Sequence, residues 1–503
     1  MSRRNIILVT IGIMLSLFLA SMESTVVATA TPTIVGQLGG LKYYSWVFAA
    51  YMLTSTATVP LYGKLSDLYG RRKLYVIAMI LFLIGSILCG LANTMTQLIL
   101  ARGLQGIGAG GIMPLAFILI GQMFSLEQRT RMQGIFSGVW GVSSIVGPLL
   151  GGFLVDSLSW RWVFYINILP GLLAGALVAG AWRDQIVSRE KPSVDYAGSS
   201  LLMIGVVTLL LGLTLAPDAS VGVDESGTSI KWILIGASLV FFLLLFWVES
   251  RAVDPILPLH LFRDRLFAAT VTHGALSGWA LFGSISFITL FVQSVLGTSA
   301  TQAGITISPM LLGWVTASIV GTRIMLKVGF RRLALIGTTA LVIGSFLMAR
   351  ADAHTSQIAL MVFVTLAGIG MGLSIPSFTI AVQTTVERRD LGTATSMMQF
   401  SRSMGGTLGV SVMGAALSAR LAANLAASNL DLELVSQLLN QVPGSDVVVN
   451  EAARLALADA ITAVFAIAFI AAALALASVF FVPKLELKDK PAAEESPAMV
   501  SAD

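Results

Sequence analysis

The sequence predicts an all-α membrane protein with fourteen transmembrane helices, and composition and segment length are the two observations that predict it. Hydrophobic residues make up 56% of the 503 positions and charged residues 11%, whereas about a quarter of an ordinary soluble domain is charged. Apolar runs of roughly 18 to 25 residues recur, and each can cross about 30 Å of hydrocarbon as a helix. Lipid offers the backbone no hydrogen-bond partners, so these runs must be helical. A soluble enzyme is excluded.

The predicted spans follow one another along the whole chain, and their even number places both termini on one side. Their centres lie near Ser16, Thr54, Phe82, Ala109, Val142, Leu172, Val206, Val240, Phe282, Gly313, Leu341, Gly368, Met404 and Ile470. Of the 31 Lys and Arg residues, 22 fall in the loops on the side of the termini and six in the opposite loops. Short loops rich in Lys and Arg stay cytoplasmic. We therefore expect both termini in the cytoplasm, in a multi-pass protein of the cell (inner or plasma) membrane.

Two basic loops mirror each other between the halves of the chain. Residues 63–73 (GKLSDLYGRRK) follow the second span, and a diverged copy at 321–332 (GTRIMLKVGFRR) follows the tenth. Such internal symmetry is typical of transporters built from two related halves, with the substrate site near the membrane midplane between them. No phosphate-binding G-x-x-x-x-G-K-[ST] motif occurs in the sequence, so an ion gradient is the expected energy source.

This symmetry predicts the domain organisation. Residues 1–183 form an N-terminal six-helix half, 184–265 two linkers and two inserted helices, and 266–483 a C-terminal six-helix half. Within the last, the polar segment 421–456 is expected to be extracellular, partly as an amphipathic helix or hairpin. The charged tail 484–503 is expected to be disordered.

Several motifs point to a known family. Residues 63–73 match the loop signature G-x-L-x-D-x-x-G-R-[RK]-x, the fourth span matches L-x-x-x-R-x-x-Q-G-x-G, and the fifth carries G-P-x-x-G-G. The residues concerned are Leu98, Arg102, Gln105, Gly106 and Gly108 in the fourth span and Gly141, Gly147, Pro148, Gly151 and Gly152 in the fifth. Finer marks are Trp46, Tyr51, Trp160, Arg161, Trp162, Phe164, Asn167, Phe400, Arg402, Gly405 and Gly406. The chain thus resembles the major facilitator superfamily, and within it the fourteen-span drug:proton antiporters of the multidrug efflux type.

The resemblance implies the major facilitator fold, with two six-helix halves and two inserted helices, and the fifth-span element is associated with antiporters rather than symporters. The first-span residues Met22 to Val27 resemble the family's L-D-x-T-[IV]-V, with Glu23 in place of the aspartate. Export is therefore favoured, while the longer acid leaves substrate range and stoichiometry open.

Glu23 is the candidate proton carrier because it is the acid placed well inside a predicted span. It lies 17 residues after Ile6, which is about 25 Å of helical rise and so in the outer half of the membrane. A low-dielectric site favours the protonated form of a lone carboxylate, and intramembrane acids are functional by default. Arg102 is expected at a similar depth. We expect it to stabilise ionised Glu23, the alternative being an arginine bonded to backbone carbonyls and Gln105.

A second set of residues is expected to govern the conformational change. Asp67 and the cluster Arg71, Arg72 and Lys73 can form charge pairs and dipole contacts with a helix end in the other half. The glycines of the fifth span allow close helix packing, and Pro148 can kink that span. The predicted gating residues are Gly63, Asp67, Gly70, Arg71, Arg72, Gly147, Pro148, Gly151 and Gly152.

An aromatic wall around a substrate cavity is the third expectation. Aromatic faces beside a buried acid suit lipophilic cations, although each ring considered alone fits ordinary packing or interfacial anchoring as well. Arg402, near the middle of its span, either sets the field in the cavity or orients a helix. The predicted cavity residues are Trp46, Tyr51, Gln105, Phe136, Trp140, Trp279, Phe282, Phe400 and Arg402.

Together these features predict a proton-coupled antiporter that exports lipophilic or cationic small molecules by alternating access. The alternatives are the same fold exporting a lipid, siderophore or metabolite, a proton-coupled uptake symporter, or a membrane receptor without flux. The expected partners are a small-molecule substrate, protons and the lipid bilayer, with no nucleic acid, no metal and no cofactor. We expect a monomer without enzymatic activity.

Overall fold

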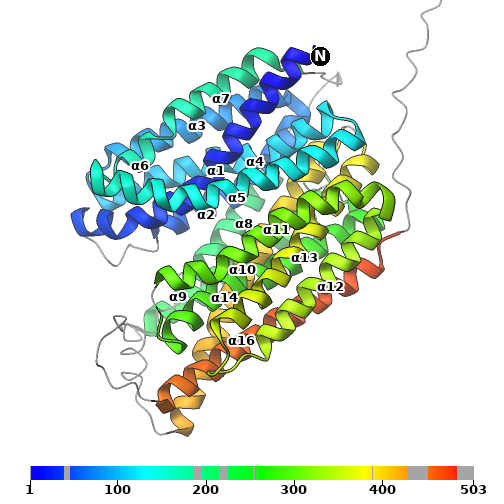
Figure 1. The fold of residues 1–503 in the computed structure, drawn as a ribbon. Helices are drawn as coiled ribbons and strands as arrows, with labels where there is room; N and C mark the ends of the chain where they lie inside the picture. Colours follow the sequence, from blue (N-terminus) through cyan, green and yellow to red (C-terminus); the bar gives the residue numbers. More distant parts are fainter. Residues whose placement is uncertain are drawn as a thin grey trace, which may run out of the picture.

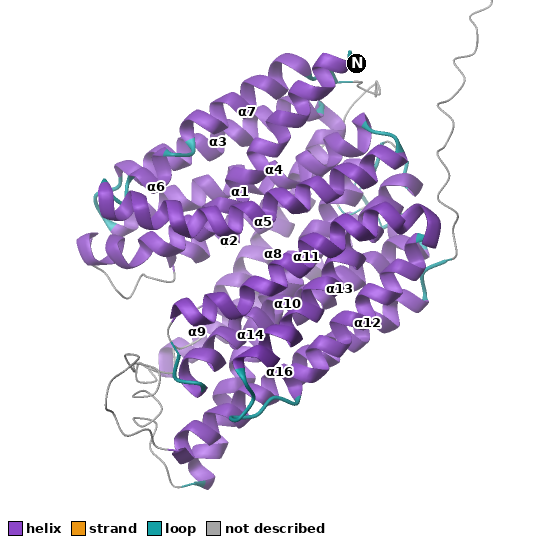
Figure 2. Ribbon diagram, viewed as in Figure 1, coloured by secondary structure: helices purple, strands orange, loops and turns teal. Residues whose placement is uncertain are grey.

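The computed structural model describes residues 2–38, 46–184, 195–214, 225–252, 255, 257, 259–298, 300–387, 389–428 and 451–483. Within these ranges the secondary structure is almost entirely α-helix, and no strand occurs (Figure 2). Long helices run back and forth through the molecule and form two groups that lean apart from each other (Figure 1). The fold is therefore all-helical, as the composition predicts.

The N-terminal group contains seven helices. They are α1 (Arg3–Leu38), α2 (Trp46–Tyr69), α3 (Arg71–Leu91), α4 (Met95–Met123), α5 (Leu126–Ser157), the short α6 (Trp162–Tyr165) and α7 (Ile168–Ala181). Helix α4 packs against α2 and α3, and α1 packs against α5 and α7. Glycines make these approaches close: a Cβ at Gly108 of α4 would lie 2.5 Å from the carbonyl oxygen of Ala78 in α3. Small residues hold membrane helices together because hydrophobicity does not drive association in lipid.

The C-terminal group contains six long helices among the described residues. They are α10 (Arg265–Leu290), α11 (Ala300–Val328), α12 (Phe330–Ala349), α13 (Gln357–Thr385), α14 (Leu391–Ala427) and α16 (Glu451–Phe480), with a π-helical turn at Phe291–Val295 after α10. Helix α13 packs between α11 and α12, and α10 packs against α14 and α16. A Cβ at Gly405 of α14 would lie 2.6 Å from the Cα of Ala275 in α10.

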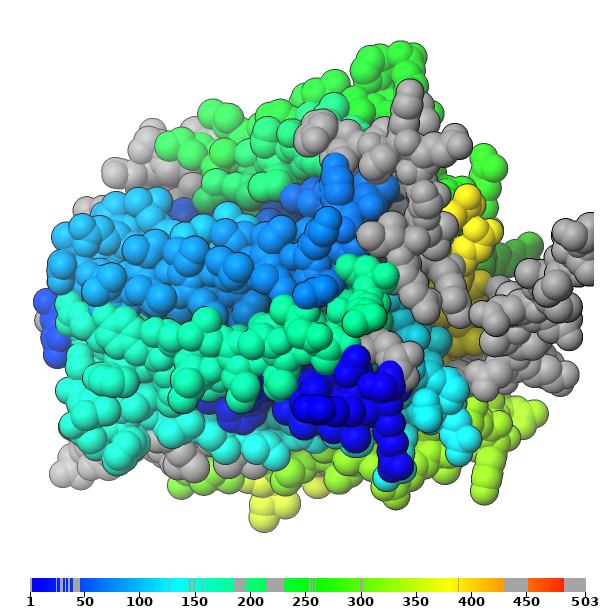
Figure 3. Space-filling view, turned by 90° about the horizontal axis from the view of Figure 1, so that it is seen from above, coloured from blue at the N-terminus to red at the C-terminus, as the bar shows by residue number. Residues whose placement is uncertain are grey.

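Helices α8 (Tyr196–Thr214) and α9 (Glu225–Glu249) form a pair that is separate in sequence from both groups. The two pack against each other, and α8 also contacts α2 and α14, so the pair touches both groups. Seen from above, the N-terminal group forms a broad face, and the green segment that includes α9 lies along one edge of it (Figure 3). Trp232, Leu243 and Phe246 of α9 are each 63% exposed, which fits a surface that meets lipid rather than water.

Each of the fourteen predicted span centres falls within one of these helices. In the described part of the chain, 11 helices are long and apolar enough to cross a membrane. Helices α2 and α5 are not among these 11, and the apolar part of α8, Ala197–Leu213, is shorter. The multi-pass architecture is thus present, while the number of fourteen spans stays a prediction.

The polar segment predicted at 421–456 is helical at both of its ends. Helix α14 continues through Leu421 to Ala427, and α16 already begins at Glu451. Residues 429–450 and the tail 484–503 lie outside the described residues.

The two mirrored loops share a backbone feature. Gly70 precedes α3 with φ of 93°, and Gly329 precedes α12 with φ of 86°. A positive φ is strained for a residue with a Cβ, so glycine is favoured at both places. The repeat inferred from sequence is therefore visible in the backbone.

Candidate substrate cavity and buried acid site

A cavity of about 1720 Å³ lies between the two helix groups. Helices α1, α2, α4 and α5 line it on one side, and α10, α11, α13 and α14 on the other. We call the end of the molecule where α1 begins and α16 ends the terminal end, and the opposite end the distal end (Figure 1). The lining reaches Leu213, Lys231 and Ser418, which lie on the distal parts of their helices. The cavity therefore extends toward the distal end.

At the terminal end, Asp67 joins the two groups. Its carboxylate accepts hydrogen bonds from the backbone N–H of Gly392 (3.1 Å) and from the N–H and hydroxyl of Thr393 (2.9 and 3.2 Å). These donors form the first turn of α14, where the helix dipole favours an anion. Arg71 binds the same carboxylate at 2.9 Å. Asp67 thus fastens the end of α2 to the start of α14.

The remaining gating residues near this loop hold it in shape. Gly63 faces α14 so closely that a Cβ would overlap the side chain of Ser396. Backbone N–H groups of Arg71 and Arg72 donate to Asp184 at 2.9 and 3.2 Å, which ties the start of α3 to the segment after α7. The approach of Gly63 to Ser396 leaves little space between the groups at the terminal end.

Two further contacts close the same end. The hydroxyls of Ser137 in α5 and Ser318 in α11 lie 2.7 Å apart. The amide of Gln383 in α13 donates to the carbonyl oxygen of Phe117 in α4 at 3.3 Å. All these residues lie on the terminal halves of their helices, so the cavity is sealed there.

The fifth-span glycines differ in how closely other helices pack against them. A Cβ at Gly147 would overlap the side chain of Thr25 in α1, and one at Gly141 would lie 2.8 Å from Val315 in α11. Gly151 is buried, whereas a Cβ at Gly152 would meet nothing within 4 Å. Pro148 falls within α5, and its side chain lies outside the described part.

Glu23 lies in a fully buried polar cluster inside the N-terminal group. Its Oε1 is 2.5 Å from Nη1 of Arg102, and each of the two side chains is 1% exposed. Gln105 donates to the same oxygen at 3.0 Å. Arg102 also donates to the carbonyl oxygen of Val47 at 3.1 Å and to Gln105 at 2.6 Å. Arg102 therefore makes both kinds of contact expected from the sequence, one with the carboxylate of Glu23 and the others with neutral acceptors.

Two members of this cluster were not given a role from the sequence. Asn167 donates to Oε2 of Glu23 at 2.7 Å, and its amide also donates to Ser86 at 3.1 Å. Ser86 in turn donates to the carbonyl oxygen of Phe164 at 2.9 Å. In the sequence, the match of Asn167 to the family pattern is the feature that singles this residue out. Both oxygens of Glu23 therefore accept hydrogen bonds from this cluster.

Neither Glu23 nor Arg102 belongs to the cavity lining. Tyr51 lies between them and the cavity: its ring centroid is 4.2 Å from Cζ of Arg102, and it also lines the cavity. In this conformation the acid site and the cavity are neighbours separated by the Tyr51 ring.

Five of the predicted cavity residues line the cavity, namely Tyr51, Phe136, Trp140, Phe282 and Arg402. Gln105 belongs to the acid cluster instead, because it faces Glu23. Trp46, Trp279 and Phe400 turn toward neighbouring helices: Trp46 packs on the α8 side, Trp279 in the core of the C-terminal group, and Phe400 against Met404 and its neighbours. These four residues do not line the cavity in this structure, and the sequence could not show this because an apolar helix gives no sign of which face meets a cavity.

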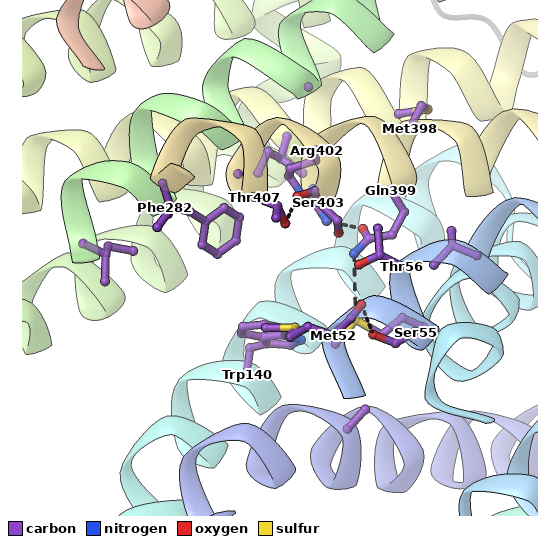
Figure 4. A pocket seen from close by; sticks show the side chains of 18 of the residues that line it. Met52, Ser55, Thr56, Trp140, Phe282, Met398, Gln399, Arg402, Ser403 and Thr407 are labelled. Atoms are coloured by element: carbon purple, nitrogen blue, oxygen red, sulfur yellow. Dashed lines mark hydrogen bonds between the residues drawn. The ribbon is translucent and has the colours of Figure 1, made fainter. Parts of the chain in front are cut away.

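Arg402 enters the cavity wall from the first third of α14 (Figure 4). Its guanidinium donates to the side-chain oxygen of Gln399, one turn earlier. His273, which also lines the cavity, hydrogen-bonds Thr338 at 2.9 Å and packs on Phe378 with ring centroids 4.6 Å apart. His273 thus has a hydrogen-bond partner and an aromatic packing partner in this structure.

Comparison with known proteins agrees with this architecture. Residues 13–410 match the Major Facilitator Superfamily. Multidrug transporter protein MdtP of Bacillus subtilis (strain 168) is 40% identical over 413 residues, covering 81% of this chain and 75% of that protein. Multidrug resistance protein 3 of the same organism is 40% identical over 407 residues, covering 81% and 78%. Efflux pump dotC of Dothistroma septosporum is 29% identical and covers 95% and 83%.

Solved structures share the fold at low identity. The proton:xylose symporter XylE, bound to 6-bromo-6-deoxy-D-glucose, matches with a TM-score of 0.61 at 15% identity over 97% of this chain and 98% of that chain. The human organic anion transporter MFSD10 matches with a TM-score of 0.58 at 13% identity over 93% and 99%. The family match and the curated relatives indicate a transporter rather than an enzyme, and they confirm the resemblance to multidrug efflux proteins. The chain belongs to the Major Facilitator Superfamily.

Proposed function

We propose that this protein exports lipophilic small molecules in exchange for protons, by alternating access of the cavity to the two sides of the membrane. The observation that carries the proposal is the buried pair of Glu23 and Arg102 beside a cavity that is sealed at one end. A buried ionisable pair is costly to keep, and a proton carrier is a use that accounts for that cost. The efflux pumps among its relatives support the direction of transport.

The topology proposed with it has fourteen spans, a half at 1–183, an insert at 184–265 and a half at 266–483, in a monomer with both termini in the cytoplasm. The terminal end is then cytoplasmic and the cavity faces outward. The contacts of Asp67 with α14 are the latch of this outward-facing state. Breaking them lets the halves rock and opens the cavity to the cytoplasm, as a two-state equilibrium requires.

In the proposed cycle, a proton from outside neutralises Glu23 and removes its attraction for Arg102. The released guanidinium of Arg102 can then change its contacts, including the one with Tyr51. Protonation of Glu23 would in this way alter the position of a side chain in the cavity wall. The proton is released to the cytoplasm, substrate binds from the cytoplasm, and the protein then returns to the outward-facing state and releases the substrate outside. One residue connects the acid site with the cavity, because Tyr51 contacts Arg102 and also lines the cavity.

The test uses purified protein in liposomes with an imposed pH gradient and a fluorescent lipophilic dye. We expect gradient-driven dye movement by the wild type and its loss in Glu23→Gln, because a glutamine cannot carry the proton. Glu127→Gln is the matched control, since that acid lies exposed in the first turn of α5. Dye movement that ignores the gradient in the wild type contradicts proton coupling. Dye accumulation in the direction of proton flow indicates a symporter.

A further inference from the structure

We propose that the cavity recognises amphiphiles that carry an anionic headgroup, and that Arg402 binds this headgroup. The inference rests on the proposed export of lipophilic molecules and names their class more narrowly. It differs from the expectation of cationic cargo, which depended on a buried acid facing the substrate.

The charge of the lining is the first argument. Among the described residues that line the cavity, the charged side chains are Arg402 and Lys231, and none is a carboxylate. Glu23 lies behind Tyr51 and its charge is matched by Arg102. A cation in the cavity would therefore meet like charge, which a low-dielectric surrounding makes costly.

The partners of Arg402 are the second argument. Arg102 and Arg71 are each paired with a carboxylate, Glu23 and Asp67. The ion pairs of the described residues include none with Arg402, whose partner is the neutral amide of Gln399. An intramembrane arginine normally has an acid or several carbonyl groups as partners. A carboxylate or sulfonate in the cavity would supply the missing partner through two parallel hydrogen bonds.

The surroundings of Arg402 fit a molecule with one polar end. Ser403 and Thr407 follow Arg402 on α14 and add hydroxyl groups to the same wall, while Phe282 from α10 lies beside them (Figure 4). Trp140 and Met52 lie on the opposite wall (Figure 4). An anionic head on α14 would thus leave an apolar body between aromatic and thioether side chains, which is the usual composition of a small-molecule site.

The experiment measures binding without any gradient. Three probes share a naphthyl-alkyl body and end in a carboxylate, a primary amide or a trimethylammonium group. Each is titrated by equilibrium dialysis against the full-length protein in nanodiscs, with empty nanodiscs subtracted. The variants are Arg402→Gln, Arg402→Lys and Lys231→Gln, and Arg350→Gln, an exposed arginine at the end of α12, is the matched control.

We expect the wild type to bind the carboxylate probe about tenfold more tightly than the ammonium probe, a difference typical of one charge-assisted contact. Arg402→Gln should lose about that factor for the carboxylate and change the amide by less than about threefold. Arg402→Lys should keep part of the preference because it keeps the charge but not the planar fork. Arg350→Gln should behave as wild type.

Tightest binding of the ammonium probe overturns the inference, and so does an equal loss of all three probes in Arg402→Gln, which would indicate a structural role. If Lys231→Gln weakens binding of the carboxylate probe and Arg402→Gln does not, the headgroup binds at Lys231 and not at Arg402. That result also overturns the inference. If none of the probes binds to wild-type protein that still unfolds cooperatively, the proposed class is wrong. Failure of proton coupling would leave the binding preference standing, so the two proposals fail separately.

Discussion

The ring of Tyr51 lies with its centroid 4.2 Å from Cζ of Arg102, and the same residue lines the cavity. One aromatic side chain therefore touches both the site that would hold a proton and the space that would hold a substrate. Cation–π contact accounts for part of the attraction, and the desolvated setting strengthens it.

Removing this ring should connect the acid site with the cavity. We expect Tyr51→Ala to admit water to Glu23 and to leak protons without substrate, and we expect Tyr51→Phe to stay tight because it keeps the ring. A pH-sensitive dye inside proteoliposomes measures the leak. Equal leaks in the two variants would show that the hydroxyl, and not the ring, separates the sites.

The charge balance within the acid cluster predicts a rescue. Arg102→Met leaves the carboxyl group of Glu23 buried without its cationic partner, which costs about 3–5 kcal/mol of folding stability. Adding Glu23→Gln removes the unpaired acid, so the double variant should recover most of the thermal stability but no proton coupling. Thermal unfolding in detergent and gradient-driven flux measure the two effects. An Arg102 variant with unchanged pH dependence of transport would refute the pairing.

Asp67 should control which end of the cavity is open. Asp67→Asn weakens three hydrogen bonds to the start of α14 and removes a charge from a helix N-terminus, a loss of about 1–2 kcal/mol. The sealed terminal end should then become about 5- to 30-fold less favoured relative to the opened one. Transport should slow because one state of the cycle is destabilised.

A cross-link can measure that equilibrium. Ser137→Cys and Ser318→Cys place two thiols where the hydroxyls are 2.7 Å apart, in a background in which Cys89, the single cysteine, is replaced by serine. We expect rapid oxidation to a disulfide and a block of transport, with a lower yield when Asp67→Asn is added. A yield that does not respond to Asp67→Asn would deny the latch.

Asp352→Asn is the control for this comparison, because the acid lies in the exposed turn between α12 and α13. A hydrogen bond from the Thr355 hydroxyl, together with one from the His354 N–H, lowers the pKa of Asp352. It is therefore charged at neutral pH, so its replacement removes the same charge far from the interface. The cross-linking yield should not change.

The fifth-span glycines offer a matched pair. A methyl group at Gly147 would overlap Thr25, whereas one at Gly152 would meet nothing within 4 Å. We expect Gly147→Ala to cost about 1–3 kcal/mol by overpacking and Gly152→Ala to be neutral or slightly stabilising. Thermal unfolding and transport rates of the two variants measure the difference. Similar effects at both positions would mean that backbone flexibility, and not the packing of α5 on α1, is what the motif supplies.

What could be predicted from the sequence depended on whether the signal was local. Helix positions could be predicted because hydropathy is a property of a single segment. The nearness of Glu23 and Arg102 followed from helical rise, since both residues were counted from a membrane boundary. The roles of Ser86 and Asn167 could not be foreseen, because polar residues of this size occur in many spans and packing alone selects these two.

The cavity lining was harder to predict than the depth of a residue. Trp140 and Phe282 line the cavity while Trp46 and Trp279 do not, although all four are aromatic residues in apolar helices. A helix that is apolar on every side carries no periodic signal for rotation about its axis. Depth along a span can thus be counted, but direction around it comes from tertiary packing.

Gly70 and Gly329 both have positive φ angles, although the other residues of their two loops differ at most positions. The second loop has no equivalent of Asp67, because residues 321–332 contain no acid, so the contact that Asp67 makes with the opposite group has no counterpart of the same kind there. This difference between the loops suggests an engineering experiment. Introducing an aspartate into the second loop would give both halves a contact of the Asp67 kind, and transport assays would test whether a protein with two such contacts can still change conformation.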